Sequence, residues 1–223
     1  EFNIGQKRTG RGRMGLINLL IKHKYGNYGL LTYVELELVL SVGMVLSYNM
    51  FYPTTRTISD YAQQFTFNFI LSVITLILVV LVIKNIAFGT GQDFFDGTII
   101  TFLQMKGRKK VFLSLYVTDV IIPGVIFILT TMTTFYLASF NVSLTWIPEY
   151  LSIYLFLSNA SYIVTILTKR PFRAFFISIV ILLLFVGVDF SQNFMLIYCY
   201  LTMMILSIIL LIASYYLFRG VSL

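Results

Sequence analysis

Long apolar segments, most of them about 20 residues or more, alternate with short polar links and limit what this chain can fold into. A bilayer core of about 30 Å takes roughly 20 apolar residues per helical crossing, and a helix satisfies its own backbone hydrogen bonds there. The apolar segments lie at about 30–52, 65–83, 111–139, 147–167, 174–188 and 194–218. With 58% hydrophobic and 11% charged residues, the composition agrees. We therefore predict an all-α integral membrane protein with six transmembrane helices.

Two of these segments depart from the ideal length. The third is too long for one crossing, so we predict that its first turns lie along the interface and that the span itself covers about 120–139. The fifth, 174–188, is short. It is either a tilted crossing that thins the membrane locally or a helix that turns back before the far side.

The positions of the basic residues predict the orientation, because Lys and Arg favour the cytoplasmic side of a membrane. With the N-terminus inside, every Lys and Arg except Arg56 falls on the cytoplasmic side. Six crossings then leave both the N- and C-termini cytoplasmic. Because Arg173 and Arg219 share that side, the fifth and sixth segments form a helical hairpin.

Residues 1–29 precede the six-helix domain of residues 30–223 and differ from it. Residues 1–13 are polar and basic, and within 14–24 the side chains of Leu16, Ile17, Leu20 and Ile21 fall on one helical face. We predict an amphipathic helix on the cytoplasmic surface, in reach of anionic lipid headgroups. A basic topology anchor of no further significance is the alternative.

Acidic residues inside or beside the apolar segments are costly there and call for an explanation. Glu35, Glu37, Asp119, Glu149 and Asp189 all fall near a predicted interface. We therefore expect them to be hydrated or to cap helices, rather than to carry ions across the membrane.

Polar uncharged residues do fall deep within the third and fourth predicted spans, at Thr130, Thr134, Ser158 and Asn159. Such hydroxyls and amides either tie neighbouring helices together or line a translocation path, and both interpretations stay open. On the predicted outer side, Asn141 begins an Asn-Val-Ser acceptor pattern for glycosylation.

Motifs of known enzymes are missing from the sequence. It has no phosphate-binding loop, no His-Glu-x-x-His and no Gly-x-Ser-x-Gly, and it holds a single His and a single Cys. We expect no catalytic residue, cofactor or metal in this chain and no nucleic-acid partner. Energy for any uphill transport would come from a partner protein or from coupled ions.

The link between the second and third segments is the most informative polar interruption. Gly89 and Gly91 are expected to break the helix, and Asp93 to cap a new amphipathic helix at about 93–105. A basic cluster at 106–110 follows. A short amphipathic helix held at the membrane face suits a docking element for a cytosolic partner.

Here the chain resembles the permease subunits of type-2 ABC exporters. The resemblance is carried by Asp93, the run 96–99, the pair 102–103 and the basic turn 108–113, and it is supported by the basic, proline-containing link at 169–173. It implies a connecting helix at 14–24 and a coupling helix at 93–105. The residues implied to contact the ATPase subunit are Asp93, Phe94, Phe95, Asp96, Gly97, Thr98, Ile99, Phe102, Leu103 and Arg108.

The same resemblance implies the partners. A separate nucleotide-binding subunit would carry ATP and magnesium, and a second permease copy or a paralogue would complete the exporter in the cell (plasma) membrane. A membrane subunit that only anchors or assembles a larger complex, for example a respiratory one, is the alternative. A secondary transporter is disfavoured, because midplane charges and an internal repeat are not evident.

Overall fold

The computed structural model describes residues 15–51, 60–137, 146–191 and 196–220, and every regular element in these ranges is a helix. In chain order the elements are α1 (Leu16–Tyr25), α2 (Gly29–Phe51), α3 (Asp60–Asn85), the π-helical turn η1 (Ile86–Thr90), α4 (Gly91–Phe95), α5 (Thr98–Met105), α6 (Arg108–Tyr116), the π-helical turn η2 (Val117–Ile121), α7 (Ile122–Leu137), α8 (Trp146–Thr168), α9 (Pro171–Ser191) and α10 (Leu196–Gly220). The predicted all-α class is confirmed.

Four helices are long and apolar enough to cross a membrane. They cover Leu71–Phe95, Arg108–Leu137, Trp146–Thr168 and Tyr200–Gly220. The part of α9 from Pro171 to Val186 is a shorter apolar helix. The chain is therefore a multi-pass membrane protein.

The helix that contains α3 does not stop at its glycines, so the predicted break at Gly89 and Gly91 is wrong. The chain continues through η1 and α4 to Phe95 without leaving helical geometry. A Cβ on Gly91 would lie 3.2 Å from the Thr165 methyl, so this glycine allows close packing against α8. The chain bends instead at Gly97, whose φ of 75° is left-handed. The predicted helix at 93–105 is consequently two helices, α4 and α5.

The third apolar segment is also continuous. α6, η2 and α7 form one helical rod from Arg108 to Leu137, and no break occurs at the predicted start of the span near Val120. The π-helical turn η2 absorbs Pro123, whose missing N–H cannot bond to the carbonyl one turn earlier. A local change in helical pitch, rather than a break, therefore marks the predicted start of the span.

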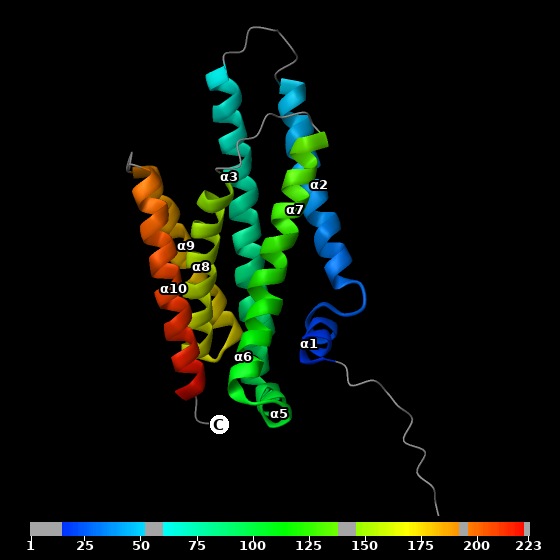
Figure 1. Cartoon of the computed structure of the whole chain (residues 1–223), viewed down its shortest axis with the longest axis vertical. Coiled ribbons are helices and arrows are strands. Elements are labelled where there is room, and N and C mark those ends of the chain that lie inside the picture. The colour runs from blue at the N-terminus through cyan, green and yellow to red at the C-terminus, as the bar shows by residue number, and fades with distance from the viewer. Residues whose placement is uncertain (1–14, 52–59, 138–145, 192–195, 221–223) are drawn as a thin grey trace, which may run out of the picture.

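Figure 1 shows the long helices standing side by side, with α1, α5 and the C-terminal end of α10 gathered at one end. We call this the basic end, because the described Lys and Arg residues lie on the parts of the helices next to it: Lys22, Lys24, Lys84, Lys106, Arg108, Lys109, Lys110, Lys169, Arg170, Arg173 and Arg219. The Arg108 guanidinium also donates to the backbone carbonyl of Arg219 and joins α6 to the end of α10.

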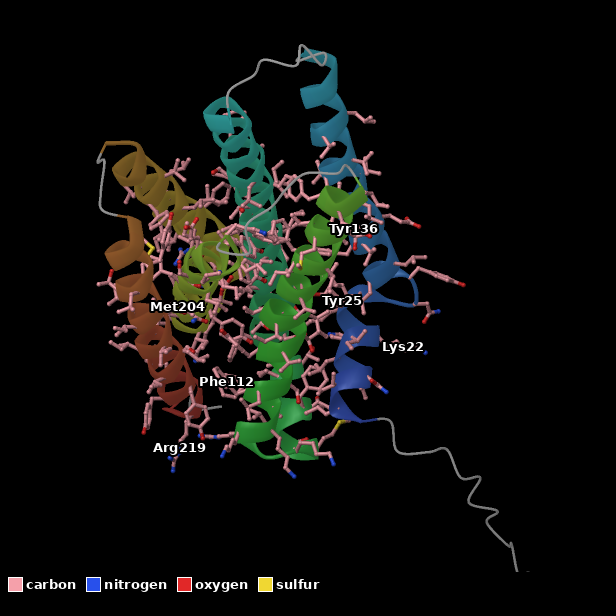
Figure 2. All side chains as sticks on the ribbon, turned by 45° about the horizontal axis from the view of Figure 1, so that its top comes forward. Lys22, Tyr25, Phe112, Tyr136, Met204 and Arg219 are labelled. Atoms are coloured by element: carbon pink, nitrogen blue, oxygen red, sulfur yellow. The ribbon has the colours of Figure 1, made fainter. Side chains whose placement is uncertain are left out.

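The interior of the bundle lies along α8 and the α6–α7 rod. α8 packs against α10, α9 and α3, and α2 packs against α7. Phe112 is 2% exposed and meets the rings of Tyr162 and Phe218, whereas Tyr136 on α7 is 83% exposed (Figure 2). Large apolar side chains cover the outer face of α10, as expected of a helix that borders lipid or another subunit.

Candidate functional site at the basic end

The bend between α4 and α5 divides its apolar side chains into two sets. Ile99 and Phe102 are almost fully buried against the bundle, at 1% and 4% exposure. Phe95, Ile100 and Met105 are exposed, at 61%, 39% and 53%. We call these three residues the exposed bend surface. Such a surface on a basic, polar end of the molecule is suited to a protein partner.

Asp93 lies at the inner side of this bend and connects it to α1. The residue is 4% exposed, and its Oδ1 is 3.0 Å from Nε2 of His23. The imidazole also meets the Phe102 ring edge to face, with centroids 5.7 Å apart. The predicted helix-capping role of Asp93 is wrong, because the helix that holds it began at Asp60. The residue instead links α1 to α4.

A buried ion pair lies next to this contact. Lys24 on α1 donates to both carboxylate oxygens of Asp119 on η2, at 2.5 and 2.6 Å, and to the Thr90 hydroxyl on η1 at 2.7 Å. The Thr90 hydroxyl donates in turn to Asp119 at 2.5 Å. The side chains of Lys24 and Asp119 are 6% and 1% exposed. We call Lys24, Thr90 and Asp119 the charged junction.

The two π-helical turns explain how this junction fits inside a helical bundle. A π-helical turn widens the helix and leaves its carbonyls poorly matched to intrahelical donors. Two tyrosines supply donors to η2, because the Tyr25 hydroxyl bonds the Thr118 carbonyl at 2.9 Å and the Tyr154 hydroxyl bonds the Val120 carbonyl at 2.6 Å. Burial, and to a smaller extent the Asp119 carboxylate, raises the pKa of Tyr25, so its hydroxyl stays protonated and can donate.

The residues predicted to contact an ATPase subunit occupy different environments. Phe95 and Asp96 are exposed, and Gln92 donates to Asp96 at 2.7 Å. Phe94 and Leu103 are half-buried, and the Phe94 ring meets Phe218 of α10. Gly97 and Thr98 form the bend itself and are half-buried. Arg108 is exposed, and its guanidinium is held against the end of α10 by the bond to the Arg219 carbonyl.

The deeper polar residues are held within the bundle. Asn159 on α8 accepts from the Tyr116 hydroxyl at 2.8 Å, and its amide donates to the carbonyl and the hydroxyl of Ser207 on α10 at 2.9 and 2.8 Å. We call Asn159, Tyr116 and Ser207 the amide junction. Ser158 is fully buried beside it. These contacts tie α8 to α6 and α10.

On the opposite side of the bundle, Thr130 of α7 meets α2. Its hydroxyl donates to Glu37 at 3.1 Å, and the Thr134 hydroxyl donates to the Thr130 carbonyl at 2.8 Å. The expectation that Glu37 and Asp119 are hydrated is therefore wrong, since they are 2% and 0% exposed. Asn141, the predicted glycosylation acceptor, lies outside the described residues.

Sequence reasoning missed His23, Lys24 and Thr90 as partners of the acidic residues. One signal in the sequence could have found them. A carboxylate such as Asp119 in an apolar segment is costly unless a cation pairs with it, and the basic residues of α1 are candidates for that cation. In the described ranges no group of three or more His, Cys, Asp or Glu residues is placed to hold a metal ion. The carboxylates of Asp93 and Asp119 are instead paired with His23 and Lys24.

The chain matches no protein-family model, no curated protein and no solved structure.

Proposed function

We propose that this chain is the membrane-spanning permease subunit of an ATP-driven exporter, and that a separate nucleotide-binding subunit docks on the exposed bend surface. The observation that carries the proposal is the exposure of Phe95, Ile100 and Met105 at the basic end, on a helix pair braced from behind by Asp93 and His23. Because this surface is fixed to the bundle, a conformational change in a bound partner can move α3 and α6. The resemblance of this segment to type-2 ABC permeases supports the same assignment.

The proposal includes six crossings with both termini in the cytoplasm. α2 has 23 residues, as does α8, and α9 has 21, so each is long enough for a crossing. The gathering of described Lys and Arg residues at one end supports a cytoplasmic location for that end. We also propose the plasma membrane as the location and a second permease copy or paralogue as a partner, which the apolar outer face of α10 would suit.

Co-purification tests the docking surface. A double Phe95→Asp/Ile100→Asp variant should lose an ATP-hydrolysing partner that wild-type protein retains when it is extracted from native membranes. Both side chains are exposed, so the fold should tolerate the change. The matched control is Leu167→Asp, a 63% exposed apolar residue at the same end but on α8, which should retain the partner.

Two outcomes would overturn the proposal. One is a wild-type preparation in which no co-purified protein carries a phosphate-binding loop and hydrolyses ATP. The other is full retention of such a protein by the double variant.

A non-transporting anchor or assembly subunit is the second candidate, and one observation favours it. The polar residues Thr130 and Asn159 are hydrogen-bonded to neighbouring helices instead of lining an open path. Co-purified haem or iron–sulfur subunits, in place of an ATPase, would establish this alternative.

A further inference from the structure

A cavity of about 570 Å³ lies between the N-terminal end of α1 and the start of the α6–α7 rod, whereas the charged junction engages α1 near its C-terminal end. Its lining consists of Gly15, Leu16, Ile17, Asn18, Lys106, Lys110, Leu113 and Ser114. It is therefore distinct from the exposed bend surface, with which it shares no residue. Among the described residues, no acidic side chain lines it.

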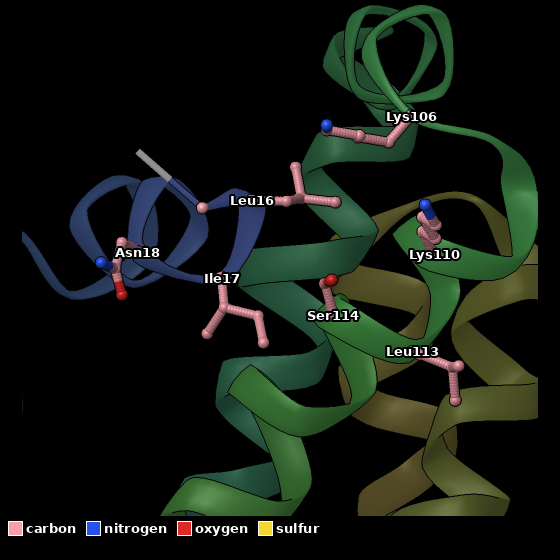
Figure 3. A pocket seen from close by; sticks show the side chains of 8 residues that line it. Leu16, Ile17, Asn18, Lys106, Lys110, Leu113 and Ser114 are labelled. Carbon is pink, nitrogen blue, oxygen red and sulfur yellow. The ribbon is translucent and has the colours of Figure 1, made fainter. Parts of the chain in front are cut away.

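The cavity has its two lysines toward one end and apolar side chains along the rest of its lining. Figure 3 shows Lys106 and Lys110 at the end nearest α5, whereas Ile17 and Leu113 lie farther along the helices toward the middle of the bundle. Ile17 and Leu113 both line the cavity and are 41% and 49% exposed. The exposed apolar wall and the unpaired ammonium groups each lack a complement in the described part of the chain.

Ser114 adds a polar group between these two ends. The residue is 8% exposed, and its side chain points into the cavity (Figure 3). A hydroxyl at the boundary between a cationic and an apolar region can donate to an ester or phosphate oxygen.

We propose that this cavity binds one anionic phospholipid, with its phosphate between Lys106 and Lys110 and an acyl chain against Ile17 and Leu113. A multi-pass membrane protein always has lipid beside it. The lysines and the apolar wall of the cavity follow each other in the same order as the charged headgroup and the acyl chains of a phospholipid. Basic pockets between helices at a membrane surface recognise anionic headgroups in this way. An acidic peptide would match the lysines but leave the apolar wall uncovered.

The consequence is a lipid that fastens α1 to the start of α6. The charged junction holds the C-terminal end of α1, and the phospholipid would hold its N-terminal end. This inference does not depend on the proposed export function, because an anchor subunit could bind the same lipid.

Lipid-specific stabilisation of the purified full chain tests the site. Thermal unfolding in detergent is measured with added phosphatidylglycerol and with phosphatidylcholine of the same acyl chains, and bound lipid is counted by native mass spectrometry. Phosphatidylglycerol should raise the unfolding temperature more than phosphatidylcholine. In Lys106→Gln/Lys110→Gln its affinity should fall by about fivefold for each lysine removed.

The matched control is Lys22→Gln/Lys109→Gln, which removes two exposed lysines from α1 and α6, the helices that flank the cavity, but outside its lining. This variant should keep the preference for phosphatidylglycerol. Leu113→Ser should weaken binding of both lipids, because it shortens the apolar wall and leaves the lysines in place.

Three results would overturn the proposal. Equal loss of preference in the two lysine variants would show only general attraction to negative surfaces. Equally strong binding of soluble glycerophosphoglycerol would identify a free phosphate site without an acyl chain. Displacement of the lipid by a poly-glutamate peptide, together with unchanged binding in Leu113→Ser, would identify an acidic protein segment as the occupant.

Discussion

The charged junction and the amide junction both join three helical elements, but they use different chemistry. At the basic end, an ammonium group from α1 neutralises a carboxylate on η2. Deeper in the bundle, the uncharged amide of Asn159 serves a hydroxyl on α6 and a serine on α10. Lys24 reaches its partner by a long side chain from a surface helix, so no lysine is needed within a spanning segment.

Because of this difference, the two junctions should differ in how much folding stability is lost when each is broken. A charge left alone in a buried site keeps its full desolvation penalty, whereas an unpaired amide loses only hydrogen bonds. The charged junction should therefore be the more fragile, although the amide junction is as fully enclosed.

The largest effect is expected from Lys24→Met. It leaves the Asp119 carboxylate, whose side chain is 1% exposed, without its cation. The free energy of unfolding should fall by about 3–5 kcal/mol. Titration of the purified protein with SDS in mixed micelles measures this loss.

The double variant Lys24→Met/Asp119→Leu sharpens the same comparison. Removal of both charges from a buried pair is often neutral, so most of the lost stability should return. Lys22→Met, on an exposed residue of α1, is the control and should change little. If the double variant is as unstable as Lys24→Met, the cost does not come from an unpaired carboxylate.

A smaller effect is expected from Asn159→Leu at the amide junction. The substitution leaves the Tyr116 hydroxyl and the Ser207 groups without their partner. The free energy of unfolding should fall by about 1–3 kcal/mol in the same titration. A loss as large as that of Lys24→Met would contradict the distinction between the two junctions.

Ser158→Ala is the matched control for that change. Ser158 is also fully buried, but its hydroxyl has no hydrogen-bond partner in the described part of the chain. Its removal should be neutral or slightly stabilising. A clear destabilisation would mean that the Ser158 hydroxyl forms a hydrogen bond with a group not named above.

The sequence predicts the helices well and their partners poorly. Segment length and hydropathy placed a helix in each of the six predicted spans, because those properties are local. The π-helical turns were not foreseen, since they arise where tertiary contacts satisfy the freed carbonyls. Tyr25 and Thr118 lie 93 residues apart, and no local pattern brings them together.

The predicted docking segment shows the same limit. The amphipathic character of α5 is readable from sequence, and its buried side at Ile99 and Phe102 follows that pattern. Which residues remain exposed depends on α1 and α10, which cover Asp93 and Phe94 from distant parts of the chain. The same holds for Asp119, whose cation lies 95 residues earlier.

Tyr154→Phe tests the donors that serve η2, the turn that carries Asp119 and directly follows Tyr116. The change removes the hydroxyl that bonds the Val120 carbonyl and leaves the ring packed against Tyr150. The free energy of unfolding should fall by about 1 kcal/mol. Tyr25→Phe is the counterpart on α1, and because it leaves the other carbonyl of the same turn unpaired, its loss should be similar. A negligible effect of both changes would indicate that η2 does not need these donors.

The smallest effect is expected from His23→Ala, which removes the contact with Asp93 beside the charged junction. The His23 side chain is 46% exposed, so water can replace the imidazole at the carboxylate, and the loss should stay below about 1 kcal/mol. Thermal unfolding in detergent detects the change, with Lys22→Ala as the control on the neighbouring exposed residue. A loss close to that of Lys24→Met would mean that α1 is held mainly at Asp93 rather than at Asp119, and the distinction between a buried ion pair and a half-exposed hydrogen bond would then fail.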